Sequence, residues 1–378
     1  MGTGCRSTGV QPMTSNNASI EIRDLYKIFG KSPAQYVEAV RKGMSKAELA
    51  KAHGQILGLN NINISMPAGK IQVVMGLSGS GKSTLIRHIN RLIEPTSGSI
   101  MINGRDVLGM SELELREFRR NHTAMVFQRF GLLPHRTVID NVTFGLEVRG
   151  VEAARSRDTA MRWIERVGLA GFEQRYPNEL SGGMQQRVGL ARALSNNASI
   201  LLMDEAYSAL DPLIRTDMQT MLLELQTELK KTIVFITHDL DEALRLGDRI
   251  VILRDGSIIQ QGDSQDILLR PADDYIERFV KDVNRGRFIK VDAVMEPAPQ
   301  SETRPLPKLK SGTTLEIAAK ELTNSTQDEA IVVDAHGKPL GSVSLRQITA
   351  ALSSAVEERS SAQGRAEGAV QKRSIAMT

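Results

Sequence analysis

The chain has 378 residues, 41% of them hydrophobic, so it is long enough to fold into two or three domains with buried cores. Its 48 Lys and Arg residues exceed its 44 Asp and Glu residues by a formal charge of only +4, which argues against nucleic-acid binding, and its single cysteine, Cys5, excludes an intrachain disulfide. A reducing, cytoplasmic compartment fits this composition, and since no apolar stretch approaches the ~20 residues of a membrane span, we expect any membrane association to depend on a partner.

The N-terminal part begins with a segment rich in Gly, Ser, Thr and Asn, residues 1–18, which predicts a disordered leader. The alternation at Ile20–Ile22 then predicts a strand. The insert that follows, residues 31–56, is predicted as two short helices, because Ser45 and Glu48 have the spacing of a capping box. Basic residues outnumber acidic ones in this insert, which is consistent either with a solvated helical face or with a docking patch.

Beyond the insert, short apolar runs alternate with amphipathic helical patterns. Runs this apolar are typical of strands that are buried on both faces, and their alternation with helices is typical of a parallel sheet. We therefore predict an α/β fold in which helices cover both faces of a mainly parallel sheet. The predicted buried strands are Ile71–Met75, Ile200–Met203, Thr232–Ile236 and Ile250–Leu253.

The pattern weakens after Leu269, and the stretch from Pro297 to Pro307 is predicted as an exposed linker. A small unit follows, and after it residues 353–378, rich in Ser, Ala and Gly, are predicted as a disordered tail. The predicted elements of the small unit are a helix near Leu315–Leu322, strands at Ala330–Asp334 and Gly341–Leu345, and a helix from Arg346.

The strongest local motif runs from Gly76 to Ser83, between a predicted strand and a predicted helix. It matches the phosphate-binding loop, whose glycines let backbone N–H groups turn toward an anion at the N-terminus of a helix. In this pattern Lys82 reaches the β- and γ-phosphates of a nucleotide, and the Ser83 hydroxyl is a ligand for Mg²⁺. The predicted nucleotide-binding residues of this region are Gly76, Leu77, Ser78, Gly79, Ser80, Gly81, Lys82, Ser83 and Thr84.

A phosphate loop needs an acidic partner at the end of another strand, and Asp204 and Glu205 directly follow the apolar run Ile200–Met203. Because parallel strands present their carboxyl ends to one crevice, we expect these carboxylates beside the loop. Asp204 is predicted to hold Mg²⁺, directly or through water. Glu205 is predicted to orient and deprotonate an attacking water.

Between the loop and these carboxylates stands the segment Leu180–Arg187, called here the signature segment. With the loop, it resembles the signature of ATP-binding cassette proteins, and the other elements of that family also occur in order. Gln128 resembles the glutamine loop, which contacts Mg²⁺ and the lytic water. Ser208–Asp211 resembles the loop that crosses the dimer interface, and His238 resembles the switch histidine, which contacts the γ-phosphate. The resemblance implies a RecA-like core, an antiparallel β subdomain and a helical subdomain at about residues 130–190.

The resemblance also implies that the chain binds ATP and Mg²⁺ and forms a homodimer, in which each ATP lies between the phosphate loop of one copy and the signature segment of the other. An aromatic residue near Gly30 is expected to stack on adenine, and Phe29 matches this position, with Tyr26 as the alternative. The residues implied for catalysis are Glu205, His238, Gln128 and Lys82. Those implied to hold Mg²⁺ are Ser83, Gln128 and Asp204. Those implied to bind the nucleotide outside the loop are Phe29, Ser181, Gly182, Gly183 and Asp211.

Residues 20–280 as a whole resemble the ATPase subunit of importers for glycine betaine and proline betaine, in particular at Lys27–Gly30, Arg91–Thr96 and Ala209–Arg215. This resemblance implies an ATP hydrolase that drives separate integral-membrane permease subunits, fed by a substrate-binding protein, from the cytoplasmic face of the bacterial inner membrane. Choline and carnitine remain possible solutes. Two other functions stay open: an importer ATPase for another solute such as an amino acid, and a soluble cassette ATPase that acts on ribosomes or DNA.

The unit from Phe288 to Leu352 resembles a single cystathionine-β-synthase (CBS) repeat. Members of the importer family often carry two such repeats, which pair to sense ionic strength or nucleotides, whereas this chain has room for one. A sensor completed by the second subunit and a degenerate dimerisation domain are both consistent with a single repeat. The predicted boundaries are 1–18 for the leader, 19–280 for the cassette, 281–352 for the CBS-like unit and 353–378 for the tail.

Overall fold

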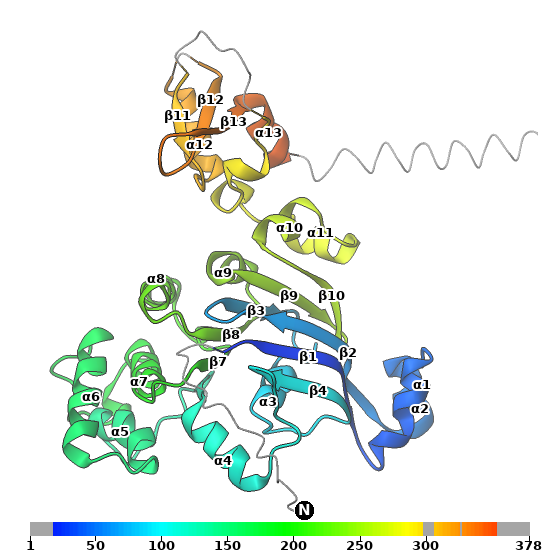
Figure 1. Ribbon diagram of the computed structural model, residues 1–378, viewed down its shortest axis with the longest axis vertical. Coiled ribbons are helices and arrows are strands. Elements are labelled where there is room, and N and C mark those ends of the chain that lie inside the picture. Colours follow the sequence, from blue (N-terminus) through cyan, green and yellow to red (C-terminus); the bar gives the residue numbers. More distant parts are fainter. Residues whose placement is uncertain (1–17, 298–305, 326, 354–378) are drawn as a thin grey trace, which may run out of the picture. The chain divides into compact units, whose positions relative to one another are not determined.

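The structure is a computed structural model that describes residues 18–297, 306–325 and 327–353 (Figure 1). Within these ranges the chain divides into two compact units, and the division falls between Ile259 and Gln260. This division comes before the predicted end of the cassette at residue 280. No helix in the described ranges is both long enough and apolar enough to cross a membrane.

Three predicted segments lie wholly or mostly outside the described residues. Of the predicted leader only Ala18 is described, and it is buried, with its backbone hydrogen-bonded to the side chain of Thr232. Most of the predicted linker between Pro297 and Pro307 and the predicted tail beyond residue 353 also lie outside. Disorder in these three segments therefore stays a prediction.

The first unit is built around a six-stranded sheet with the strand order β10-β9-β3-β8-β7-β6. The pairs β3–β8, β3–β9, β6–β7 and β7–β8 are parallel, so the predicted mainly parallel α/β fold is confirmed. Every residue of β3, β7 and β8 is buried, which explains why their sequences are mostly apolar. The strands are β3 (Ile71–Met75), β6 (Thr123–Phe127), β7 (Ile200–Asp204), β8 (Thr232–Thr237), β9 (Arg249–Arg254) and β10 (Ser257–Gly262).

A second, four-stranded sheet has the order β2-β1-β4-β5 and is antiparallel, as the resemblance implies. Helix α3 (Lys82–Ile89) packs between the two sheets: Leu85 and Ile89 of α3 share one buried cluster with Ile62 of this sheet and Leu202 of the main sheet. This packing holds the helix that follows the phosphate loop. The strands are β1 (Ile20–Phe29), β2 (Ile56–Met66), β4 (Ser97–Ile102) and β5 (Arg105–Asp106).

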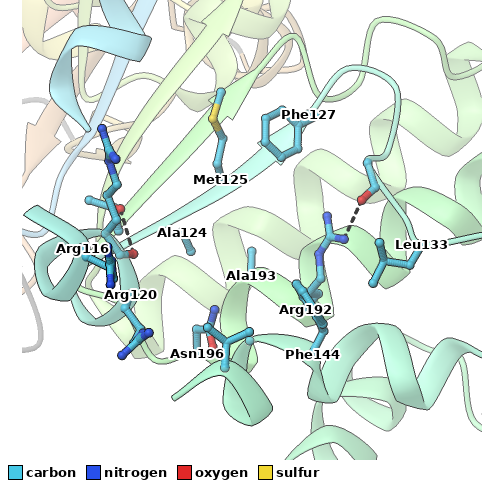
Figure 2. A pocket seen from close by; sticks show the side chains of 15 residues that line it. Arg116, Arg120, Ala124, Met125, Phe127, Leu133, Phe144, Arg192, Ala193 and Asn196 are labelled. Carbon is cyan, nitrogen blue, oxygen red and sulfur yellow. Dashed lines mark hydrogen bonds between the residues drawn. The ribbon is translucent and has the colours of Figure 1, made fainter. Parts of the chain in front are cut away.

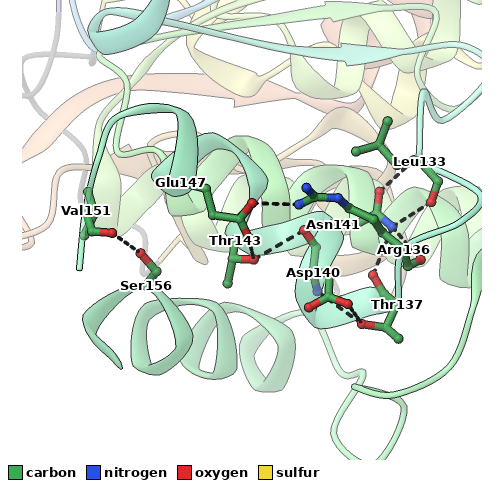
Figure 3. Close-up of polar contacts among 9 residues, drawn as sticks. All are labelled: Leu133, Arg136, Thr137, Asp140, Asn141, Thr143, Glu147, Val151 and Ser156. Carbon is green, nitrogen blue, oxygen red and sulfur yellow. Dashed lines mark hydrogen bonds and ion pairs between the residues drawn. The ribbon is translucent and has the colours of Figure 1, made fainter. Parts of the chain in front are cut away.

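Helices α5, α6 and α7 form a bundle with its own core, which includes Val142, Ile164 and Val188 and lies within the predicted helical subdomain. Polar contacts begin the first of these helices (Figure 3): Thr137 caps it, and the Asn141 amide donates to three backbone carbonyls at its start. The bundle therefore has a buried core of its own and a capped first helix. The helices of the first unit after α3 are α4 (Glu112–Asn121), α5 (Val138–Val148), α6 (Ala153–Arg166), η2 (Pro177–Glu179), α7 (Gly182–Ser195), α8 (Pro212–Leu229) and α9 (Leu240–Leu246).

The predicted insert folds as η1 (Pro33–Tyr36), α1 (Val37–Arg41) and α2 (Lys46–His53). Both halves of the predicted capping box are present, since the Ser45 hydroxyl accepts from the Glu48 backbone N–H and the Glu48 carboxylate accepts from the Ser45 N–H. The apolar side of the insert is buried against β1 and β2, which fixes it to this hairpin. The buried residues of this cluster are Tyr26, Ile28, Val37, Val40, Leu49 and Leu57.

The second unit contains a three-stranded sheet of order β11-β12-β13, in which β11 and β12 are parallel and β12 and β13 antiparallel. The helix, strand, turn, strand and helix predicted for the CBS-like unit occur in that order. The elements are α10 (Ser264–Leu269), α11 (Asp274–Val280), η3 (Arg285–Arg287), η4 (Val291–Ala293), β11 (Lys308–Lys310), α12 (Leu315–Thr323), β12 (Glu329–Val333), β13 (Pro339–Ser344) and α13 (Leu345–Ser353).

Candidate functional site

The predicted phosphate loop joins the end of β3 to the start of α3, which is the strand–loop–helix arrangement that the motif requires. Gly76 has a φ of 148°, and a Cβ there would lie 2.2 Å from the carbonyl oxygen of Leu253, so only glycine fits. Lys82 is buried, and its Nζ donates to the carbonyl oxygens of Gly76 at 2.8 Å and Leu77 at 3.0 Å. Burial lowers the pKa of this ammonium group, which is held over the loop.

Two predicted metal ligands meet beside the loop. The Ser83 hydroxyl donates to Asp204 Oδ1 at 2.8 Å, and the Arg87 guanidinium lies 3.6 Å from Asp204 Oδ2. A hydroxyl and a carboxylate side by side are hard oxygen donors, which Mg²⁺ prefers. This pair of oxygen donors fits the chemistry of a Mg²⁺ site.

Glu205 is the centre of a cluster of polar side chains. Its backbone has a φ of 47°, a left-handed conformation that costs a non-glycine residue about 1 kcal/mol or more, and its N–H donates to the Ile236 carbonyl in β8. Gln128 Nε2 donates to Glu205 Oε2 at 3.4 Å, and His238 Nδ1 lies 3.4 Å from the same oxygen. Lys82 Nζ lies 3.7 Å from Glu205 Oε1. The structure thus gathers the other three residues predicted for catalysis around the Glu205 carboxylate.

Three of these residues, Lys82, Gln128 and Glu205, border a hollow of about 460 Å³, called here the nucleotide hollow, whose lining also includes Phe29 and Ser78 but not His238. Phe29 is 37% exposed, and the Lys27 ammonium lies 4.9 Å from the centroid of its ring. Tyr26 is 5% exposed and packs in the core beneath the insert. Of the two aromatic candidates, Phe29 is therefore the one whose ring can stack on a base.

Four further lining residues were not predicted from the sequence: Lys46, Ile56, Leu57 and Gly58. Gly58 faces Phe29, because a Cβ on Gly58 would lie 2.6 Å from the ring. A glycine inside a strand often marks such a close approach, so Gly58 carried a usable signal. Ile56 and Leu57 reach the hollow because β2 pairs with β1, and Lys46 reaches it because α2 packs on these two strands; no local motif reveals either arrangement.

The signature segment does not contribute to the described lining of the nucleotide hollow, and neither does Asp211. Ser181 and Asp211 instead begin helices: the Ser181 hydroxyl accepts from the Met184 N–H at 3.3 Å, and the Asp211 carboxylate accepts from the Ile214 N–H at 3.0 Å. Within one chain, these predicted nucleotide contacts are therefore not brought to the phosphate loop.

Arg215 joins two of the predicted loops, which the sequence did not indicate. Its guanidinium donates to Asp239 Oδ2 at 3.1 Å and to the Leu210 carbonyl at 3.2 Å. Leu210 precedes Asp211, and Asp239 follows His238. Because Arg215 donates to both loops, movement of either loop strains the hydrogen bond from Arg215 to the other.

A second hollow, of about 520 Å³, lies beside α4, β6, α5 and α7 and is called here the apolar groove (Figure 2). Phe127, Phe144 and Val148 line it and are 38%, 37% and 48% exposed. Arg116 and Arg120 of α4 lie at one side of the groove (Figure 2). Because Phe127 directly precedes the predicted glutamine loop, the groove adjoins the catalytic cluster.

Comparisons with known proteins point to one family. Residues 59–208 match the family model described as ABC transporter. The chain is 52% identical over 278 residues to the glycine betaine/carnitine transport ATP-binding protein GbuA of Listeria monocytogenes serotype 1/2a (strain 10403S), covering 74% of this chain and 70% of that protein. It is 45% identical over 333 residues to the glycine betaine/proline betaine transport system ATP-binding protein ProV of Escherichia coli (strain K12), covering 88% and 82%.

Among solved structures, the chain is similar to the dimeric structure of MJ0796, a bacterial ABC transporter cassette. The TM-score is 0.56 and the sequence identity 32%, with 65% of this chain and 98% of that chain covered. The shared fold therefore extends over nearly all of that cassette.

Proposed function

The chain belongs to the ABC transporter family, among the ATP-binding subunits of glycine betaine transport systems, and from this premise we propose that it hydrolyses ATP to drive a quaternary ammonium importer. Glycine betaine and proline betaine are the proposed solutes, with carnitine in the same chemical class. The observation that carries the proposal is the convergence of Lys82, Gln128, Glu205 and His238 beside the phosphate loop.

We propose that ATP binds with its base on Phe29 and its phosphates on the loop. The loop N–H groups, the N-terminus of α3 and the Lys82 ammonium all offer positive charge to the phosphates. Ser83 and Asp204 would hold Mg²⁺, with Gln128 as a further contact, and the ion supplies positive charge to the β- and γ-phosphates when it is bound.

Glu205 is proposed as the general base. Its carboxylate orients the attacking water and takes a proton as the water oxygen bonds to the γ-phosphorus; the bond from this phosphorus to the bridging oxygen breaks, releasing ADP. The amide of Gln128 and the imidazole of His238, each 3.4 Å from Glu205 Oε2, hold the carboxylate in position. His238 also contacts the γ-phosphate in this proposal.

A second copy of the chain is proposed to complete the site. Ser181 and the N–H groups of Gly182 and Gly183 lie outside the nucleotide hollow of their own chain, and in a head-to-tail pair they would contact the γ-phosphate held by the other copy. Asp211 would lie in the loop that crosses the interface. The dimeric state of the similar MJ0796 cassette supports this arrangement.

The test is the variant Glu205→Gln. We expect ATP turnover to fall by a factor of about 10³, because the amide keeps the shape of the side chain but cannot take the proton. ATP binding should persist, and the ATP-bound dimer should accumulate in size-exclusion chromatography with light scattering. Glu224→Gln, at an exposed carboxylate of α8, is the matched control and should change neither readout. Normal turnover or failure to dimerise in Glu205→Gln would show that the role is wrongly assigned.

The permease is proposed to dock in the apolar groove from the cytoplasmic face of the bacterial inner membrane. The exposed rings of Phe127 and Phe144 and the guanidinium groups of Arg116 and Arg120 fit a short permease helix with one apolar and one acidic face. Such a helix would lie next to the glutamine loop, so that docking would affect the position of Gln128.

The groove proposal is tested with Val148→Asp, which places a negative charge among the apolar groups. We expect co-purification of the permease from membranes to fall at least about tenfold, because the charge would be buried in the interface. ATP binding by the isolated chain should stay normal. Leu113→Asp, at a 68% exposed leucine outside the groove, is the control. Permease recovery that is equal for both variants would contradict the proposed docking site.

For the second unit, we propose one CBS-like repeat, paired with the repeat of the other copy. The order of its elements, from α12 to α13, supports this assignment.

A further inference from the structure

We propose that the insert between β1 and β2 is part of the nucleotide site, with Lys46 as a direct contact to the bound nucleotide. This inference rests on the proposed binding of ATP and adds a residue from outside the phosphate loop. Lys46 lines the same hollow as Phe29 and Lys82, although more than thirty residues of sequence separate Lys46 from Lys82. The insert thus contributes Lys46 to a site whose other residues are proposed to bind the base and the phosphates.

The position of Lys46 is fixed from two sides. The capping box of Ser45 and Glu48 sets the first turn of α2, where Lys46 is the first helical residue. Leu49, one turn further, is fully buried in the cluster against β1 and β2. These are the strands that carry Phe29 and Gly58, so the insert and the stacking ring share one support. The Lys46 side chain is therefore held on a packed helix and not on an irregular loop.

The Lys46 ammonium group makes only a weak ion pair among the described residues. Its nearest acidic neighbour is Asp255, with 3.7 Å between Nζ and Oδ1, and the two side chains are 39% and 77% exposed. Ion pairs of this length between exposed groups contribute little to stability. Lys82 differs, because it is buried and donates to two loop carbonyls. Lys46 can therefore turn toward an anionic ligand at small cost.

The chemistry of the hollow assigns the part of the ligand that Lys46 meets. In the proposed binding mode the base stacks on Phe29, and the β- and γ-phosphates contact the loop and Lys82. The ribose and the α-phosphate lie between them in any adenine nucleotide, and both offer oxygen acceptors to an ammonium donor. ATP and ADP share these groups. The contact should therefore strengthen the binding of both nucleotides by the same factor.

The test compares Lys46→Ala with Lys51→Ala in the full chain, using calorimetric titration with Mg-ATP and with Mg-ADP. Lys51 is an exposed lysine on the same helix and does not line the hollow, so its variant is the matched control. We expect Lys46→Ala to raise both dissociation constants about threefold to tenfold. Lys46→Arg should retain most of the affinity, and Lys51→Ala should equal the unmodified chain.

Several outcomes would overturn this inference. Unchanged dissociation constants in Lys46→Ala would remove the contact, and a loss for ATP alone would move it to the γ-phosphate. Equal losses in Lys46→Ala and Lys51→Ala would reduce it to a general effect of surface charge. If the unmodified chain bound neither nucleotide, the proposed function itself would fail, and that result is distinct from a null effect of the Lys46 variant.

Discussion

The phosphate-loop region and the signature segment differ in how far one chain completes them. Around the loop, side chains from four different segments contact one another, and Glu205 alone has Lys82, Gln128 and His238 within 3.7 Å. In the signature segment, the Ser181 hydroxyl contacts only the start of its own helix among the hydrogen bonds of the described residues. Both regions are equally recognisable as motifs in the sequence.

This difference indicates that the phosphate-loop region can act within one chain, whereas the signature segment needs a partner. A cluster whose members hold one another can bind a nucleotide in a single copy. A serine and two glycines at a helix N-terminus offer donors but lack the partner to which they donate. The phosphate-loop cluster, called here the binding half of the site, and the signature segment that completes the site are therefore proposed to come from different copies. Hydrolysis then depends on dimerisation, whereas nucleotide binding is largely independent of it.

The largest effect on the binding half is expected from Phe29→Ala. Base–aromatic stacking contributes about 1 to 3 kcal/mol, so the affinity for ATP should fall about tenfold even in the monomeric chain. Calorimetric titration at a concentration below dimerisation measures this loss. Tyr26→Phe keeps the buried ring and should leave the affinity unchanged. If the Tyr26 variant lost affinity and the Phe29 variant did not, the stacking role would pass to Tyr26.

A smaller effect concerns the stability of the helix behind the loop. His88 of α3 is fully buried, and burial lowers its pKa to about 4, against 6.5 for an exposed histidine. Between these values the unfolded chain binds a proton that the native chain does not, so stability falls as the pH falls from 6.5 toward 4. Between pH 7 and pH 5 this loss is about 2 kcal/mol.

The variant His88→Gln should show less of this acid sensitivity, because glutamine can still donate to the Thr84 carbonyl but does not titrate. Unfolding temperatures at pH 7 and pH 5 measure the difference. The exposed His135, replaced in the same way, is the control. An equal drop on acidification in all three proteins would exclude His88 as a source of acid sensitivity.

The features that one local segment determines could be predicted from the sequence. The capping box at Ser45 and Glu48 depends on four residues, and the buried strand Ile71–Met75 shows its burial in its composition. The phosphate loop is also contiguous, so its placement between a strand and a helix followed directly. The family resemblance named Gln128 and His238, but their distances to Glu205 arise from the order β6-β7-β8 in the sheet.

Other features depend on contacts that the sequence does not encode locally. The left-handed backbone of Glu205 accompanies a hydrogen bond from its N–H to the carbonyl of Ile236 on the neighbouring strand. Lys46 reaches the nucleotide hollow only through the packing of the insert on β1 and β2. The division between Ile259 and Gln260 likewise rests on long-range contacts, whereas the sequence pattern predicts the end of the cassette at residue 280.

The most direct test of the composite site mixes two inactive chains. Lys82→Ala disables the loop, and Gly182→Asp sets a negative charge against the γ-phosphate; a Cβ at Gly182 has only an ordinary contact of 3.6 Å with Phe130, so the fold should persist. We expect each variant alone to lose at least about 99% of turnover. Co-expressed with different tags and purified as a heterodimer, they should regain up to about half of it, because one of the two sites combines an intact loop with an intact signature segment. No recovery in a verified heterodimer, or full turnover by a monomer, would contradict a site shared between two copies.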